Sequence, residues 1–231
     1  MNEKFIGIIA AEDKEMSAIK NKMINVEEEK IYNLTFYKGK INSTRYVLVK
    51  SGVGKVNSAR TAQILIDKFA IEGVINIGSA GGINESLEIG DIVIGKKLVQ
   101  HDFDVTAFGR EKGFIPDTGK VFESDKTLIE NIKNSLNTIN EDFNIHIGTI
   151  ATGDTFITDI ESKDRIRLEL NADCVEMEGA AIAQTCMLCN IPFVVIRGIS
   201  DVPNGNNQLD FDTYLEMISK RVADVLEKLI V

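Results

Sequence analysis

Acidic and basic side chains follow two apolar runs in the second half of the chain. Glu176 and Glu178 come after residues 172–175, and Arg197 and Asp201 come after residues 191–196. Each run predicts a buried strand that leads into a polar crevice, and in open α/β sheets such crevices bind ligands. Removing charged groups from water costs free energy, so charged residues at such a position indicate a function. We therefore interpret these residues as the centre of a ligand site.

Strand and helix patterns alternate along almost the whole chain. Continuous apolar runs predict buried strands, helical spacing predicts amphipathic helices, and short alternating runs predict antiparallel strands. The predicted strands are residues 5–11, 31–38, 45–51, 73–79, 91–102, 145–151, the region of Cys174, and 193–199. The predicted helices are residues 13–23, 55–69, 124–136, 160–170, 177–188 and 211–229. Together they predict one α/β domain, residues 1–231, with a mixed sheet flanked by helices.

Residues 103–122 show little periodicity and predict a long loop. They contain several glycines and Pro116. Loops of this length inside compact domains are usually functional or disordered.

Composition limits the classes of partner. The chain has 231 residues, is 44% hydrophobic and 26% charged, and carries a formal net charge of −9. Nucleic acids and anionic membranes require basic patches, so neither is expected as a partner. Lys163, Arg165 and Arg167 are interpreted as one face of a solvated helix. Because the sequence shows neither a signal peptide nor an apolar run of membrane length, we expect a soluble cytoplasmic protein.

Cysteines, histidines and glycine turns give weaker signals. The three cysteines form no even disulfide framework, which predicts buried thiols in a reducing compartment. With two histidines in the chain, neither a metal nor an organic cofactor is expected. The glycine turns at 51–55 and 78–82 could bind a phosphate through backbone N–H groups. Both lack the full nucleotide fingerprints and are equally well explained as tight turns, so both interpretations stay open.

Four segments, in their order along the chain, resemble one enzyme family. They are 77–82 (Ile-Gly-Ser-Ala-Gly-Gly), 101–109 (His-Asp-Phe-Asp-Val-Thr-Ala-Phe-Gly), 175–178 (Val-Glu-Met-Glu) and 197–201 (Arg-Gly-Ile-Ser-Asp). Together they resemble the 5′-methylthioadenosine/S-adenosylhomocysteine nucleosidases, from the first strand to the last helix. The resemblance implies a barrel-like mixed sheet, similar in fold to the purine nucleoside phosphorylases, and a homodimer. It also implies hydrolysis of the N-glycosidic bond of a 5′-thio-substituted adenosine to adenine and a thioribose.

The resemblance implies roles for the reacting groups. Asp201 matches the acid that protonates N7, so that adenine leaves as a neutral base, and Ser200 would orient it. To hold or relay that proton near neutral pH, the carboxyl would need desolvation or nearby negative charge. Glu178 matches the ligand of the ribose hydroxyls beside an oxocarbenium-like transition state. Glu15 matches the general base that activates water.

Further residues match the binding groups of that family. Ser79 and Arg197 would hold the water and the carboxylates, and Met177 would pack on the sugar and the base. Glu176 would either support the site from behind or lie on the surface. Phe156 would stack on adenine, and the backbone of Ile157 would read the base edge. The expected 5′-alkylthio pocket consists of Val53, Phe108 and Phe211, while Val105 and Pro116 would reach the pocket of the neighbouring subunit.

Two residues depart from the family pattern. Glu12 stands where methionine is common, and we expect it to turn to solvent or to raise the pKa of Glu15 by repulsion. Arg110 stands where tyrosine is frequent, at the expected mouth of the pocket.

Three alternatives stay open. A phosphorylase would bind phosphate through an arginine where this chain has Asn76, and through a Gly-Asp-Pro type loop where residues 10–12 read Ala-Ala-Glu. Acidic groups in that loop would repel phosphate, which favours water as the nucleophile. A non-catalytic nucleoside-binding protein would not need the three acidic residues assigned above. A related hydrolase could act on another 6-amino or 6-oxo purine nucleoside, because Asp201 could donate to N7 of either base.

Overall fold

The computed structural model describes residues 4–139, 143–202 and 211–229, and for residues 211–213 it describes the backbone only. The strands are β1 (Phe5–Ala10), β2 (Ile24–Ile31), β3 (Leu34–Ile41), β4 (Thr44–Lys50), β5 (Ile71–Gly82), β6 (Ile92–Gln100), β7 (Phe122–Glu123), β8 (Ile145–Thr152), β9 (Cys174–Glu176) and β10 (Phe193–Asp201). The helices are α1 (Asp13–Lys22), α2 (Lys55–Lys68), α3 (Lys126–Leu136), α4 (Ile160–Leu170), α5 (Gly179–Leu188) and α6 (Phe211–Lys228), with a short 3₁₀ turn η1 (Thr106–Phe108).

The strands form one mixed sheet, part of which closes on itself. β5 pairs with β10, β10 with β6, β6 with β8, β8 with β9, and β9 again with β5. β1, β4, β3 and β2 extend the sheet outward from β5, and β7 pairs with β6. β5 reaches three neighbours because it is 12 residues long: β1 pairs along its first half and β9 at its last two residues. This closed ring brings several strand ends to one place.

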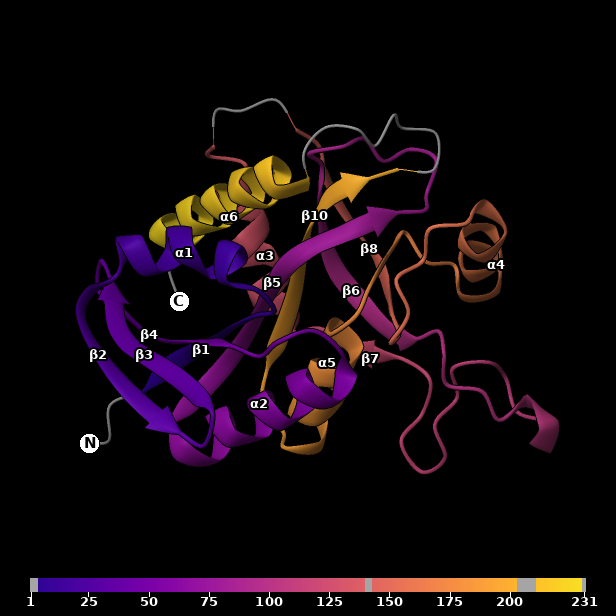
Figure 1. Cartoon of the computed structure of the whole chain (residues 1–231), viewed down its shortest axis with the longest axis horizontal. Coiled ribbons are helices and arrows are strands. Elements are labelled where there is room, and N and C mark those ends of the chain that lie inside the picture. Colours follow the sequence, from indigo (N-terminus) through magenta and orange to yellow (C-terminus); the bar gives the residue numbers. More distant parts are fainter. Residues whose placement is uncertain (1–3, 140–142, 203–210, 230–231) are drawn as a thin grey trace.

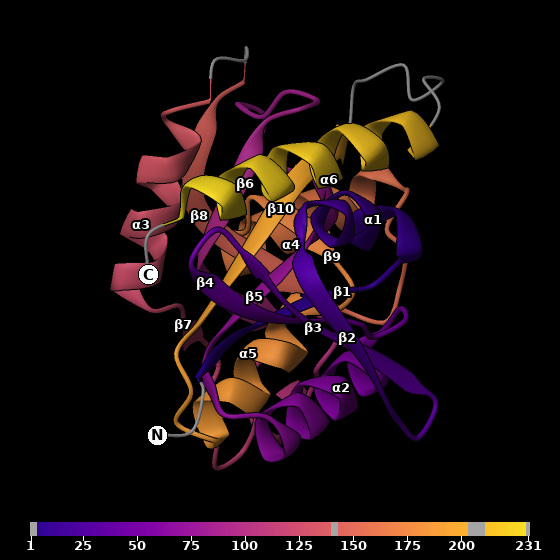
Figure 2. The ribbon, with the colours of Figure 1, turned by 90° about the vertical axis from the view of Figure 1, so that its left-hand side faces the viewer.

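The helices cover the sheet in separate groups (Figure 1). Figure 2 shows α1, α3 and α6 together on one side of the sheet and α2 and α5 on the opposite side, while Figure 1 shows α4 apart from the other helices. Apolar stripes fix these positions: Ile19 of α1 packs in the same core cluster as Ile218 and Val222 of α6. Among the described helices, none combines the length and the apolar character that crossing a membrane needs.

Local sequence signals explain where the helices near the site begin and how closely they approach. Asp159 caps α4, because its side chain accepts a hydrogen bond of 2.8 Å from the backbone N–H of Ser162. α6 lies directly against β10 at Gly198, where a Cβ atom would stand only 2.4 Å from Ile218. Glycine is therefore required at that contact.

The predicted elements are largely observed, and the differences have physical causes. The strand predicted at 31–38 is wrong in its boundaries, because the chain turns at Tyr32, which has a φ of 55°. β2 was not predicted, because its residues are polar and exposed; it is held at the edge by pairing with β3. α5 begins at Gly179 rather than at residue 177, since Glu178 has a non-helical backbone. Between 103 and 121 the chain forms η1 and an isolated bridge, as expected of a loop.

Candidate functional site

One pocket lies where β1, β5, β9 and β10 end and where the segment before α4 passes. It brings together ten of the predicted site residues: Glu15, Val53, Ser79, Phe156, Ile157, Glu176, Met177, Glu178, Ser200 and Asp201. They come from distant parts of the sequence. The closed ring brings Glu178 and Asp201 together, and β1, which pairs with β5 of the ring, brings Glu15 in α1 to the same cavity.

The other predicted site residues lie elsewhere. Arg197 lies beneath the pocket and is only 1% exposed. Val105, Phe108 and Pro116 belong to the 103–122 segment and are not among the described pocket-lining residues. The side chain of Phe211 falls outside the described residues. Arg110 does not line the described pocket either; its guanidinium lies 5.2 Å from the ring centroid of Phe114 in the same segment.

Glu15 is held rigidly inside the first turn of α1. Its Oε2 accepts hydrogen bonds from the backbone N–H groups of Ala11 (2.9 Å) and Glu12 (3.0 Å), and its Oε1 accepts one from Ser79 (3.2 Å). Burial raises the pKa of Glu15, and the Arg197 charge and the backbone hydrogen bonds offset part of that rise. A carboxylate of raised basicity, fixed in place, suits a group that takes a proton from water.

Glu12 lies at the edge of the pocket with its side chain exposed to solvent. Its backbone N–H donates to Glu15 Oε2 and lowers the pKa of Glu15. Of the two expectations for Glu12, the structure supports the turn toward solvent.

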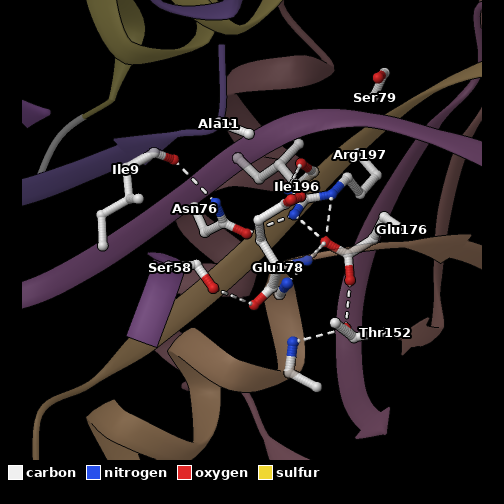
Figure 3. A network of polar contacts seen from close by, with 12 residues as sticks. Ile9, Ala11, Ser58, Asn76, Ser79, Thr152, Glu176, Glu178, Ile196 and Arg197 are labelled. Carbon is white, nitrogen blue, oxygen red and sulfur yellow. Dashed lines mark hydrogen bonds and ion pairs between the residues drawn. The ribbon is translucent and has the colours of Figure 1, made fainter. Parts of the chain in front are cut away.

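A buried ion pair supports the floor of the pocket (Figure 3). The guanidinium of Arg197 donates from Nε to Glu176 Oε2 at 3.1 Å and from Nη2 to the same oxygen, and Nη2 also donates to Asn76 Oδ1 at 2.6 Å. Asn76 in turn donates to the carbonyl of Ile9 at 2.9 Å. The hydroxyl of Thr152 donates to the other oxygen of Glu176. Glu176 therefore supports the site from behind, and the expectation that it could be a surface group is wrong.

The same ion pair sets the position of Glu178. Glu176 Oε2 accepts hydrogen bonds from the backbone N–H groups of Glu178 (3.1 Å) and Gly179 (2.7 Å), which fixes the turn that aims Glu178 into the pocket. Glu178 Oε1 accepts from the backbone N–H of Gly54 at 2.8 Å. Burial, with the Glu176 charge, raises the pKa of Glu178 to about 7. The glycine turn at 51–55 thus contacts a carboxylate in this structure.

Asp201 ends β10, and among the described residues its side chain has two side-chain partners. Ser200 Oγ donates to Asp201 Oδ1 at 3.1 Å, as expected of an orienting hydroxyl. Lys163 Nζ donates to Asp201 Oδ2 at 3.0 Å. The Lys163 side chain is only 3% exposed, so the prediction that it lies on a solvated helix face is wrong. The sequence also led us to expect burial or negative charge around this carboxyl, whereas its nearest charged partner is an ammonium.

Sequence reasoning missed Lys163, Thr152 and the structural role of Asn76. One signal could have identified Lys163: it shares a helical stripe with Ile166 and Leu170, at spacings of three and seven residues, and both of these are buried. Thr152 and Asn76 carry no comparable signal, because their partners are distant in sequence.

The remaining walls of the pocket are apolar. Phe156, which is 68% exposed, and Ile157 come from the segment before α4, and Met177 and Val53 approach from the side of Glu178. An aromatic ring, aliphatic groups and convergent carboxylates suit a ligand with a flat base and a sugar. Chemically, the arrangement offers a proton acceptor, a ligand for hydroxyls and a carboxyl beside an ammonium.

Comparisons with known proteins identify the family. Residues 5–231 match the model of the phosphorylase superfamily. The 5′-methylthioadenosine/S-adenosylhomocysteine nucleosidase of Staphylococcus haemolyticus (strain JCSC1435) is 40% identical over 226 residues, 97% of this chain and 98% of that protein. The structure of such a nucleosidase from S. pneumoniae with the transition-state inhibitor MT-ImmA has a TM-score of 0.88 at 41% identity, covering 98% of this chain and 97% of that one. The native futalosine hydrolase of Helicobacter pylori has a TM-score of 0.90 at 32% identity, covering 98% and 96%.

These matches confirm the predicted fold class and the resemblance inferred from the sequence. The identity extends over nearly the whole of both chains rather than over isolated motifs. The chain belongs to the 5′-methylthioadenosine/S-adenosylhomocysteine nucleosidase family of the phosphorylase superfamily.

Proposed function

We propose that this protein hydrolyses the N-glycosidic bond of 5′-methylthioadenosine, S-adenosylhomocysteine and 5′-deoxyadenosine, releasing adenine and the corresponding 5-substituted ribose. The observation that carries the proposal is the convergence of Glu15, Glu178 and Asp201 on one pocket. Relatives named for the first two substrates are about 40% identical over nearly the whole chain, which supports the same chemistry here.

Each acidic residue has a task that its surroundings support. Glu15 takes a proton from the attacking water, because burial raises its pKa and its oxygens are fixed by backbone N–H groups. Glu178 accepts hydrogen bonds from the ribose hydroxyls and stabilises the positive charge that develops on the sugar. Asp201 passes a proton to N7, so that the base leaves without negative charge.

The neutral walls position the base and the tail of the substrate. Phe156 stacks on adenine, Ile157 reads the base edge through its backbone, and Met177 packs on the sugar. Val53 begins the channel for the 5′ substituent. These roles follow the family resemblance, and the placement of all four residues on the same pocket supports them.

Water is a better nucleophile for this pocket than phosphate. Among the described residues that line it, there is no lysine or arginine, while Glu12, Glu15 and Glu178 are acidic. Asn76 stands where a phosphorylase would carry a phosphate-binding arginine, and its side-chain oxygen accepts a hydrogen bond from Arg197. Arg197 itself is engaged by Glu176. A phosphate dianion would therefore meet carboxylates without a compensating cation.

We also propose that a second copy completes the site and that the enzyme acts in the cytoplasm, in methionine salvage. Phe108 is 84% exposed although it is aromatic, and it lies in the same segment as Val105 and Pro116. Cover by a partner would remove this apolar surface from water. All three cysteines are free thiols, as suits a reducing compartment.

The dimer is tested by light scattering after size exclusion. Phe108→Asp is expected to weaken the dimer and to raise KM for 5′-methylthioadenosine. Tyr32→Asp is the control, because Tyr32 is 78% exposed on the distant β2–β3 turn. A monomeric wild-type protein with full activity would contradict the shared site.

The catalytic proposal is tested by adenine release from the three nucleosides, with and without phosphate. Asp201→Asn is expected to lower kcat by about 10²-fold or more while leaving most of the binding affinity. Asp164→Asn, at an exposed position on α4, is the matched control. Dependence on phosphate would instead identify a phosphorylase, binding without release would identify a binding protein, and cleavage restricted to 6-oxo nucleosides would identify a related hydrolase.

A further inference from the structure

Lys163 is a buried cation beside the carboxyl group of Asp201. It lies in the first turns of α4, its side chain is 3% exposed, and it extends to Asp201 at the end of β10. Lysine is rarely buried to this extent unless it is paired. Replacing a buried ion pair by apolar side chains is often neutral or stabilising, so stability alone does not account for the pair.

The pair places a proton donor against the carboxyl group of Asp201. Asp201 Oδ1 accepts a hydrogen bond from Ser200, and Oδ2 accepts one from the ammonium of Lys163. The ammonium lies 3.0 Å from the carboxyl group that lines the pocket. In this arrangement an N–H proton donor is in direct contact with Asp201 on the side of Oδ2.

We propose that Lys163 stores the proton that Asp201 passes to N7 of the departing purine. Because it acts through Asp201, it is a positioning residue of the nucleosidase reaction. This inference rests on the function proposed above.

The proton transfers balance. As the C1′–N9 bond breaks, its electron pair moves onto the purine; Asp201 Oδ2 receives a proton from Lys163 Nζ, and Asp201 passes that same proton to N7, so that its carboxylate is left unchanged. The oxygen of water bonds to C1′ and gives its proton to Glu15. At the end Lys163 is a neutral amine and Glu15 is protonated, and exchange of one proton with solvent at each residue restores the resting state.

Ser200 is compatible with both states of the carboxyl group. Its hydroxyl has two acceptors within reach, Asp201 Oδ1 at 3.1 Å and the carbonyl of Ala80 at 3.3 Å. A hydroxyl carries one donor and accepts as well. It can therefore donate to the carboxylate, or donate to Ala80 and accept from a protonated Asp201, without a change of position.

Other titratable groups surround the pair from several elements. On the pocket side they are Glu12, Glu15, Glu176 and Glu178; beyond α4 they are Glu85, His101, Asp102 and Lys112; on α4 and its cap they are Asp159, Glu161, Asp164, Arg165, Arg167 and Glu169. The ion pair described for Lys163 is with Asp201. A change in pH dependence that appears only when residue 163 is altered therefore reports on this pair.

The experiment compares Lys163→Met, Lys163→Arg and the control Arg165→Met in the full-length enzyme. Methionine has a similar length and no charge. Arginine keeps the positive charge but does not release a proton in proteins. Arg165 is an exposed cation on the same helix. For each variant, kcat and KM for 5′-methylthioadenosine are measured as a function of pH, and thermal unfolding checks the fold.

Both substitutions at position 163 are expected to lower kcat at neutral pH by about 10²-fold, with little change in KM. In Lys163→Met the alkaline limb of the kcat profile should move to lower pH, because the reaction then depends on a proton held by Asp201 itself. Arg165→Met should retain the wild-type profile.

Three results would overturn the proposal. Wild-type kcat in Lys163→Arg would show that only the charge matters. A higher kcat in Lys163→Met, with the alkaline limb moved to higher pH, would show that Lys163 restrains the acid. Carboxyl ¹³C NMR, with Asp201 assigned through Asp201→Asn, gives a result independent of turnover: a protonated Asp201 in the wild-type enzyme at neutral pH would refute the inference even if the proposed activity failed separately.

Discussion

A single methyl group at Gly78 should separate catalysis from folding. Gly78 lies on β5 beside Glu15, and a Cβ atom there would stand 2.9 Å from Glu15 Oε1 and 3.5 Å from Arg197 Nη1. Reaching the 3.4 Å of ordinary contact requires the carboxylate to move by about 0.5 Å. The same oxygen accepts the 3.2 Å hydrogen bond from Ser79, and a shift of this size breaks that bond.

The magnitude follows from that displacement. Misplacing a reacting group by about 1 Å reduces rates by about 10²-fold, so Gly78→Ala should lower kcat between about 10- and 100-fold. KM should change little, because Glu15 does not hold the base. Overpacking should reduce the free energy of unfolding by about 1–3 kcal/mol. The hydrogen bond from Ser79 lowers the pKa of Glu15, so its loss raises that pKa and should move the acid limb of the kcat profile to higher pH.

The assay is adenine release as a function of pH, with urea unfolding in parallel. Gly73→Ala is the matched control on the same strand, since its Cβ would meet no atom closer than 3.5 Å. This variant should keep the wild-type kcat, and its free energy of unfolding should lie within about 0.5 kcal/mol of the wild-type value. A Gly78→Ala enzyme with wild-type kcat and an unmoved acid limb would refute the role of Glu15 as a precisely placed base.

Three further predictions concern charge and packing around the site. Burial raises the pKa of Glu178 to about 7, so its contribution to stability is full below about pH 4.5 and is lost as pH rises through about 7; Glu178→Gln should flatten that decline in urea unfolding. Arg197→Met leaves Glu176 buried without its cation and should reduce the free energy of unfolding by about 3–5 kcal/mol. Gly148→Ala, whose Cβ would lie 2.0 Å from Asp173 Oδ2, should reduce the unfolding temperature or prevent folding altogether.

The elements that the sequence predicted well are those whose own residues determine them. β1 and β10 are buried along almost their whole length, so a continuous apolar run is their direct signature. β2 could not be predicted in this way, because its exposed residues carry no apolar pattern. Its strand conformation comes from pairing with β3, in which Lys38 contacts Glu27 and Glu29.

The sequence could not predict which side chains of the site contact each other when they come from separate elements. Motif matches pointed to Glu15, Glu178 and Asp201, and the structure brings these residues to one pocket, because the ends of β9 and β10 in the ring and of β1 beside it meet there. They could not show that Lys163, from a helix far along the chain, would lie beside Asp201. Three basic residues at alternate positions of α4 suggested a solvated face, although the helix turns only Lys163 inward among them.

The distribution of the two cations explains how the acidic residues of the pocket differ in function. Arg197 pairs with Glu176 and Lys163 pairs with Asp201. Glu15 and Glu178 have no cation of their own among the described contacts, and burial raises the pKa of both. A carboxylate of raised pKa is a stronger proton acceptor, as the attack of water requires of Glu15, whereas the carboxylate of Asp201 lies beside a proton donor. The direction of proton flow that we propose, from Lys163 toward the base and from water toward Glu15, thus matches which acids the fold has paired.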